Sequence, residues 1–98
     1  MSEAESHKIL AVERTQTGVR LEKRMLKVLK ALAEYLDLSL GDLLEGMVLH
    51  AFENKPPFKP ETLQVIARLK EVYGMDYGLE ASHRFIENAL TLSSETQV

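Results

Sequence analysis

Two side chains that can form paired hydrogen bonds with a nucleic-acid base, Gln16 and Arg20, lie close together in the segment RTQTGVRLEKR, which begins at Arg14. An arginine can donate two hydrogen bonds to O6 and N7 of guanine, and a glutamine can pair with adenine in the same bidentate way. Lys23 and Arg24 follow directly, and their charge suits phosphate, which it attracts without reading sequence. The chemistry that these residues could perform is recognition of double-stranded DNA.

The positive charge of the chain is concentrated around this segment. From Arg14 to Lys30 there are six basic residues and one acid, Glu22, whereas the rest of the chain has six basic and fourteen acidic residues, for a formal net charge of −3. A basic patch on an acidic body can bind a polyanion through one face. The same pattern is also typical of a solvated helix surface, so this alternative stays open.

A catalytic or metal site has little support in the sequence. The chain has no cysteine, and its three histidines, His7, His50 and His83, are far apart without the spacing of a zinc site. There is no glycine-rich phosphate loop, no nucleophile elbow and no HExxH motif. We therefore expect no enzyme, no cofactor and no metal.

Helical periodicity predicts the elements that must position the basic residues. Apolar side chains at steps of three and four predict a helix over residues 22–36. Ser39 is suited to cap a second helix, which must end before the proline-rich stretch NKPPFKP. We expect a third helix over 61–73, closed by Gly74, and a fourth from Leu79 to about Leu90.

Residues 15–21 alternate in polarity, which indicates a short strand. One side carries Val19 and Leu21, and the other carries Gln16, Gly18 and Arg20. A lone strand is unstable in water, and the simplest partner is the same strand of a second copy. Such an antiparallel pair would project the polar side outward, and a two-stranded ribbon fits the major groove of DNA.

The stretch TGVRLEKRMLKVLKALAEYLDLSLGDLLEGMVLHAFENK resembles a ribbon-helix-helix domain of the Arc/MetJ type. The similarity lies in the V-R-L strand end, the L-x-x-L-x-x-L-A pattern of the first helix and the small polar turn before the second, and covers about residues 16–55. The resemblance implies a mainly α, dimeric fold whose paired strands read bases. It also implies that backbone amides at Ser39 and Leu40 clamp a phosphate.

These observations predict four regions: an arm over 1–13, the ribbon-helix-helix domain over 14–55, a helical extension over 56–92 and a tail over 93–98. The expected contacts fall into three sets: bases (Gln16, Gly18, Arg20), phosphates (Arg14, Lys23, Arg24, Ser39, Leu40) and the dimer interface (Val19, Leu21, Leu43, Leu44, Met47, Val48).

The expected function is that of a cytoplasmic, homodimeric, sequence-specific DNA-binding regulator of the repressor kind, with assembly beyond the dimer conceivable on DNA. The N-terminus lacks the pattern of a signal peptide, and no apolar run reaches transmembrane length. The alternative is a helical dimer that binds only protein, as an antitoxin binds its partner. The C-terminal helices offer a surface for such a partner, with Tyr73, Tyr77 and Phe85 as anchors, or they form a stabilising cover over the dimer core.

Overall fold

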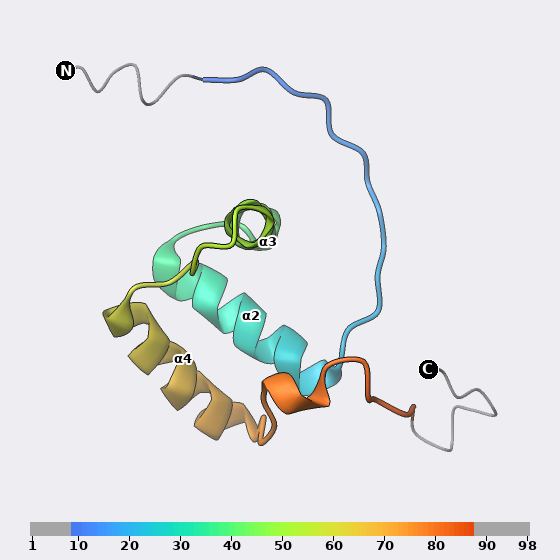
Figure 1. Ribbon diagram of the computed structural model, residues 1–98, viewed down its shortest axis with the longest axis vertical. Helices are drawn as coiled ribbons and strands as arrows, with labels where there is room; N and C mark the ends of the chain where they lie inside the picture. The colour runs from blue at the N-terminus through green and yellow to red at the C-terminus, as the bar shows by residue number, and fades with distance from the viewer. Residues whose placement is uncertain (1–8, 88–98) are drawn as a thin grey trace.

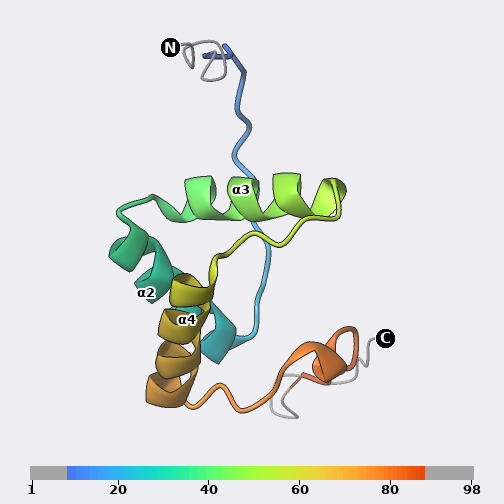
Figure 2. The same ribbon diagram turned by 60° about the vertical axis from the view of Figure 1, so that its left-hand side comes forward.

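The computed structural model describes residues 9–87, which form three α-helices and one short 3₁₀ helix (Figure 1). The helices are α2 (Lys23–Leu36), α3 (Leu40–Phe52) and α4 (Pro60–Tyr73), and the 3₁₀ helix is η1 (Leu79–Ala81). Residues 9–22 are an extended segment that leads to the start of α2 and passes α3 on the way (Figures 1 and 2). No helix in the described residues is long and apolar enough to span a membrane.

Helix α2 is fixed at both ends by local hydrogen bonds. The carboxylate of Glu22 accepts a hydrogen bond from the Met25 amide at 3.0 Å, and so satisfies an amide that the helix cannot pair. Asp37 ends the helix in the left-handed region at φ 62°, and the Leu38 amide donates to the Ala33 carbonyl at 2.9 Å. The predicted helix over 22–36 is confirmed, with Glu22 as its cap.

Helices α3 and α4 also begin and end as their sequences indicate. The Ser39 hydroxyl accepts a hydrogen bond from the Asp42 amide at 3.1 Å, which confirms Ser39 as the cap of α3. Pro60 is the first residue of α4, where a missing amide proton costs nothing. Gly74 ends α4 at φ 70°, a conformation that glycine adopts without steric cost.

The core lies where α4 packs along α2 and α3 crosses above them (Figures 1 and 2). Four of its side chains are buried, Leu29, Leu32, Ala33 and Leu43. Partly buried apolar side chains from all three helices and from the α3–α4 connection surround these four: Met25, Leu36, Leu40, Leu44, Met47, Phe58, Val65, Ile66 and Leu69. Residues 60–73 therefore belong to the same core as the preceding two helices.

The predicted ribbon-helix-helix fold is wrong for the structure described over 9–87, because these residues contain helices and no strand. Residues 15–21 are extended, but they pair with no other segment of the described chain. A strand is defined by backbone hydrogen bonds to a neighbouring strand, and the described residues offer no second extended segment beside this one. The alternation in the sequence therefore identified an extended conformation but not a ribbon.

The predicted fourth helix is also wrong over the residues that the structure describes. Leu79–Ala81 form a single 3₁₀ turn, and the chain continues to residue 87 without a helix. His83 takes φ 63°, which breaks helical geometry, and Leu79 is 90% exposed, so no apolar face holds a helix here. The last part of this prediction, 88–90, lies outside the described residues.

Candidate nucleic-acid interface

Three lysines form a stripe along the outer side of α2. Lys23, Lys27 and Lys30 are four and three residues apart, so they lie on one side of the helix. All three are exposed, whereas the buried side chains of α2 face α3 and α4. Within residues 9–87 these lysines form no ion pair with an acid, so the stripe carries three positive charges toward solvent.

The predicted base-contacting residues lie in the extended segment that leads into this stripe. Gln16, Gly18 and Arg20 are all exposed. A Cβ atom added at Gly18 would meet nothing within 4 Å, so the backbone there is open to approach from outside. The structure thus brings the base-contact candidates into one accessible segment, continuous with Lys23.

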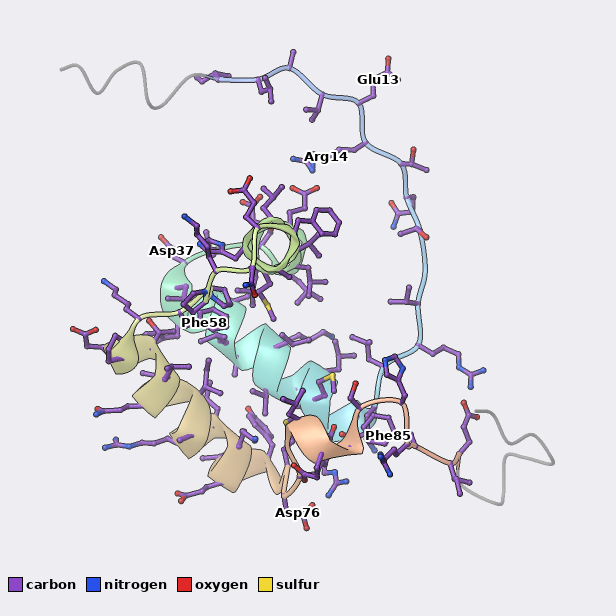
Figure 3. All side chains as sticks on the ribbon, in the orientation of Figure 1. Glu13, Arg14, Asp37, Phe58, Asp76 and Phe85 are labelled. Carbon is purple, nitrogen blue, oxygen red and sulfur yellow. The ribbon has the colours of Figure 1, made fainter. Side chains whose placement is uncertain are left out.

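Two arginines of this segment are engaged by acids. Arg14 reaches toward α3, where its Nη1 donates to Glu45 Oε2 at 2.8 Å (Figure 3). The Arg20 guanidinium donates to the carboxylate of Glu87 near the C-terminal end of the described chain. The Arg20 side chain remains 80% exposed, and exposed ion pairs are weak and screened by salt. Either arginine can therefore exchange its carboxylate for another anion.

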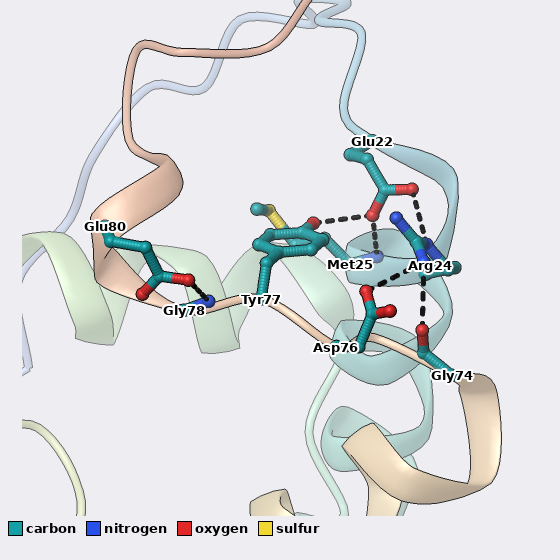
Figure 4. Close-up of polar contacts among 8 residues, drawn as sticks. All are labelled: Glu22, Arg24, Met25, Gly74, Asp76, Tyr77, Gly78 and Glu80. Carbon is teal, nitrogen blue, oxygen red and sulfur yellow. Dashed lines mark hydrogen bonds and ion pairs between the residues drawn. The ribbon is translucent and has the colours of Figure 1, made fainter.

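Arg24 is held far more firmly than the other basic residues (Figure 4). Its Nε donates to Glu22 Oε2 at 3.0 Å, and its Nη1 lies 3.0 Å from the Gly74 carbonyl and 3.2 Å from Asp76 Oδ1. The guanidinium also lies over the Tyr77 ring, 5.4 Å from the ring centroid. Arg24, predicted to contact phosphate, is thus placed in a contact that joins the start of α2 to the residues after α4.

The Glu22 carboxylate is the centre of this contact. It accepts hydrogen bonds from the Tyr77 hydroxyl at 2.5 Å, from Arg24 and from the Met25 amide. Burial alone would raise its pKa, but the hydrogen bonds from Tyr77, Arg24 and Met25 outweigh burial and lower the pKa of Glu22 to about 2. Burial and the hydrogen bond to this carboxylate together raise the pKa of Tyr77 to about 12.

At the start of α3, where the backbone amides of Ser39 and Leu40 are predicted to hold a phosphate, the helix cap pairs the Asp42 amide and not these two. Ser39 Oγ accepts a hydrogen bond from the Asp42 amide, and the Leu40 side chain is half-buried against the core. The Asp42 carboxylate lies in the first turn, where it complements the helix dipole and opposes a second anion.

The predicted dimer residues separate into two groups. Leu43 is only 3% exposed and lies in the core of this chain. The others remain accessible in part: Val19 (72% exposed), Leu21 (39%), Val48 (45%) and the half-buried Leu44 and Met47. Leu44, Met47, Val48 and Ala51 line an open groove on α3, which the residues 54–57 close on one side. We call this surface the α3 groove.

Sequence reasoning did not find the partners of the arginines. Glu22 and Tyr77 are 55 positions apart, and Arg20 and Glu87 are 67 apart. Acids and tyrosines in an exposed C-terminal segment carry no pattern that assigns them to a distant arginine. Among the residues that the structure describes, no group of three or more histidine or acidic side chains could hold a metal ion.

No protein-family model, curated protein or solved structure matches this chain.

Proposed function

We propose that this chain is a DNA-binding regulator that acts as a homodimer. The lysine stripe of α2 contacts the phosphate backbone, and the extended segment that precedes it lies in a groove as an arm. The observation that carries the proposal is the stripe itself, because three lysines with no ion pair among residues 9–87 point away from the core and continue directly from the exposed segment that carries Gln16 and Arg20. No paired ribbon is part of this proposal.

The two parts of this surface have different tasks. Lysines attract phosphate as point charges and bind every sequence about equally. Arg20 and Gln16 have side chains that can discriminate bases, and extended arms reach base edges in the grooves of DNA without belonging to a sheet. Specificity should therefore depend on the extended segment, and general affinity on α2.

The second copy is proposed to bind at the α3 groove. Only five apolar side chains are buried in the described residues, which is a small core even for a domain of this size. Val48 and Phe52 on α3 are 45% and 79% exposed, and the chain offers nothing over 9–87 that covers them. A groove lined by apolar side chains on both copies is self-complementary around a twofold axis.

The test of DNA binding is the salt dependence of affinity for a random-sequence duplex, measured by fluorescence anisotropy. If Lys23, Lys27 and Lys30 each contact one phosphate, changing all three to glutamine should reduce the log–log salt slope by roughly 2.7. The matched control replaces by glutamine Lys59, Arg68 and Lys70, which lie off the stripe and outside the α3 groove, and should change the slope much less. If the parent protein does not bind duplex DNA at low salt, the proposal is wrong and the protein-binding alternative stands.

Base reading is tested by selecting bound sequences from a random pool and then measuring Arg20→Ala. The variant should lose about 10-fold or more in affinity for the selected site, while its affinity for random DNA should fall much less. An equal loss of affinity for both duplexes would mean that Arg20 contacts phosphate and not bases.

Dimerisation is tested by sedimentation equilibrium at micromolar concentration, where a mass of twice 11.1 kDa is expected. Val48→Glu in the α3 groove should produce a folded monomer. Leu49→Glu, on the opposite side of the same helix, should leave the dimer intact. A parent protein that sediments as a monomer would refute the second part of the proposal.

A further inference from the structure

The residues after α4 turn back across the start of α2, where the extended segment joins it (Figures 1 and 2). We call residues 74–87 the strap. Its ring contact between Tyr77 and Phe85, with centroids 5.2 Å apart and planes at 79°, holds its two ends together. The strap thus lies at the junction of the two parts of the proposed DNA-binding surface.

Negative groups of the strap contact two arginines, Arg20 in the extended segment and Arg24 in α2. Asp76 and the Gly74 carbonyl accept hydrogen bonds from Arg24, and Glu87 accepts one from Arg20. The strap contains three acids, Asp76, Glu80 and Glu87, and one arginine, Arg84, so its formal charge is −2. It therefore presents to these arginines what a DNA backbone would present, namely oxygen acceptors with negative charge.

We propose that the strap is an autoinhibitory element, which occupies Arg20 and Arg24 in the free protein and is displaced when DNA binds. This inference rests on the proposed function. The two contacts differ in how easily they are exchanged. The Arg20–Glu87 pair is exposed on both sides, so a phosphate replaces Glu87 readily, whereas Arg24 has three hydrogen-bond acceptors and a ring face.

This difference gives the displacement an order. DNA first takes Arg20 from Glu87, and the loss of that contact frees the end of the strap. Arg24 becomes available only when Asp76 and Tyr77 also leave, which uncovers the Glu22 carboxylate beside the phosphates. A protein that binds DNA in this way has lower affinity than its basic residues alone would provide, and anything that holds the strap elsewhere raises the affinity.

The first experiment measures affinity for a random-sequence duplex of about 20 base pairs at low salt. Asp76→Asn with Glu87→Gln in the full chain should bind about 2- to 5-fold more tightly for each contact released. The matched control, Glu61→Gln with Glu71→Gln, makes the same change in net charge on α4, where neither acid contacts an arginine. Circular dichroism must show that both variants are folded.

The second experiment follows hydrogen exchange of peptides covering 75–87, with and without the same duplex. Exchange should become faster when DNA binds, because the backbone bonds of this segment, such as that from the Ala81 amide to the Gly78 carbonyl, lose their support. Unchanged or slower exchange would refute the autoinhibitory role of the strap, and so would equal affinities of the strap and control variants. Neither result would contradict DNA binding itself. A parent protein that binds no DNA would instead refute the proposed function, and the strap with it.

Discussion

Replacing Glu22 by glutamine should remove a defined part of the acid sensitivity of this protein. The pKa of Glu22 falls from its ordinary value of 4.5 to about 2 on folding. Because the folded-state pKa is the lower one, ionised Glu22 stabilises the fold at every pH above about 4.5, and this stabilisation is lost as the pH falls from 4.5 toward 2.

The size of the effect follows from the same change. One pKa unit corresponds to about 1.4 kcal/mol, so the fall from 4.5 to about 2 sets an upper bound of about 3.5 kcal/mol. The Glu22 side chain is 20% exposed, and water weakens its interactions, so we expect about 1–2 kcal/mol in practice. At pH 7 Glu22→Gln should therefore be less stable than the parent by this amount, and at pH 2.5 the difference should fall to about a quarter of that, because the folded-state pKa is about 2.

Urea unfolding followed by circular dichroism, at one protein concentration and several pH values, measures this difference directly. Glu13→Gln is the control, because this substitution removes the same charge and Glu13 lies in the exposed extended segment. Tyr77→Phe should reproduce part of the loss, since it deletes the 2.5 Å hydrogen bond while leaving Arg24 and the Met25 amide in place. If Glu22→Gln follows the parent at a constant offset from pH 7 to pH 2.5, the reasoning is refuted.

Four further substitutions test the fold, each by its free energy of unfolding in urea. Leu32→Ala should cost about 3 kcal/mol, because Leu32 is 2% exposed at the centre of the core, and a loss below about 1 kcal/mol would contradict that position. Ser39→Ala should cost about 1 kcal/mol through the lost cap of α3, and no change would mean that water replaces the cap. Gly74→Ala should destabilise by about 1 kcal/mol because φ is 70°, whereas Gly46→Ala, inside α3 with open space around it, should stabilise by roughly 0.5–1 kcal/mol.

The helices were predictable because their signals are local. Ser39 and Gly74 act within a few residues of their own positions, and apolar side chains three and four residues apart define each buried face without knowledge of the partner. The two errors have the opposite origin. The polarity pattern of 15–21 fits an extended chain, but whether that chain pairs depends on another segment. The helix expected from Leu79 needed an apolar surface to pack on, but the Leu79 side chain is exposed and packs on no such surface.

The candidate site was predictable in its charges and not in its contacts. Lys23 and Arg24 are adjacent and equally basic in the sequence, yet one points to solvent and the other enters a contact with Glu22, Asp76 and the Gly74 carbonyl. Neighbouring helix positions differ by about 100° in direction, so one of two consecutive residues can face a packed segment while the other does not. The path of the chain after α4 decides that Arg24 meets Gly74 and Asp76 while Lys23 does not.

That path also explains how an acidic protein can keep a basic face. Helix α4 packs on the apolar side of α2, so its own acids, Glu61 and Glu71, are carried on a different side of the molecule from the lysine stripe. The acids that do contact the basic residues of 14–30 are Glu22, Glu45, Asp76 and Glu87, and they pair with arginines and leave the lysines of α2 unpaired over the described residues. The acids therefore neutralise arginines and not lysines. A polyanion can replace the acids in the exposed arginine pairs, and the free lysine charges attract a polyanion before any pair is broken.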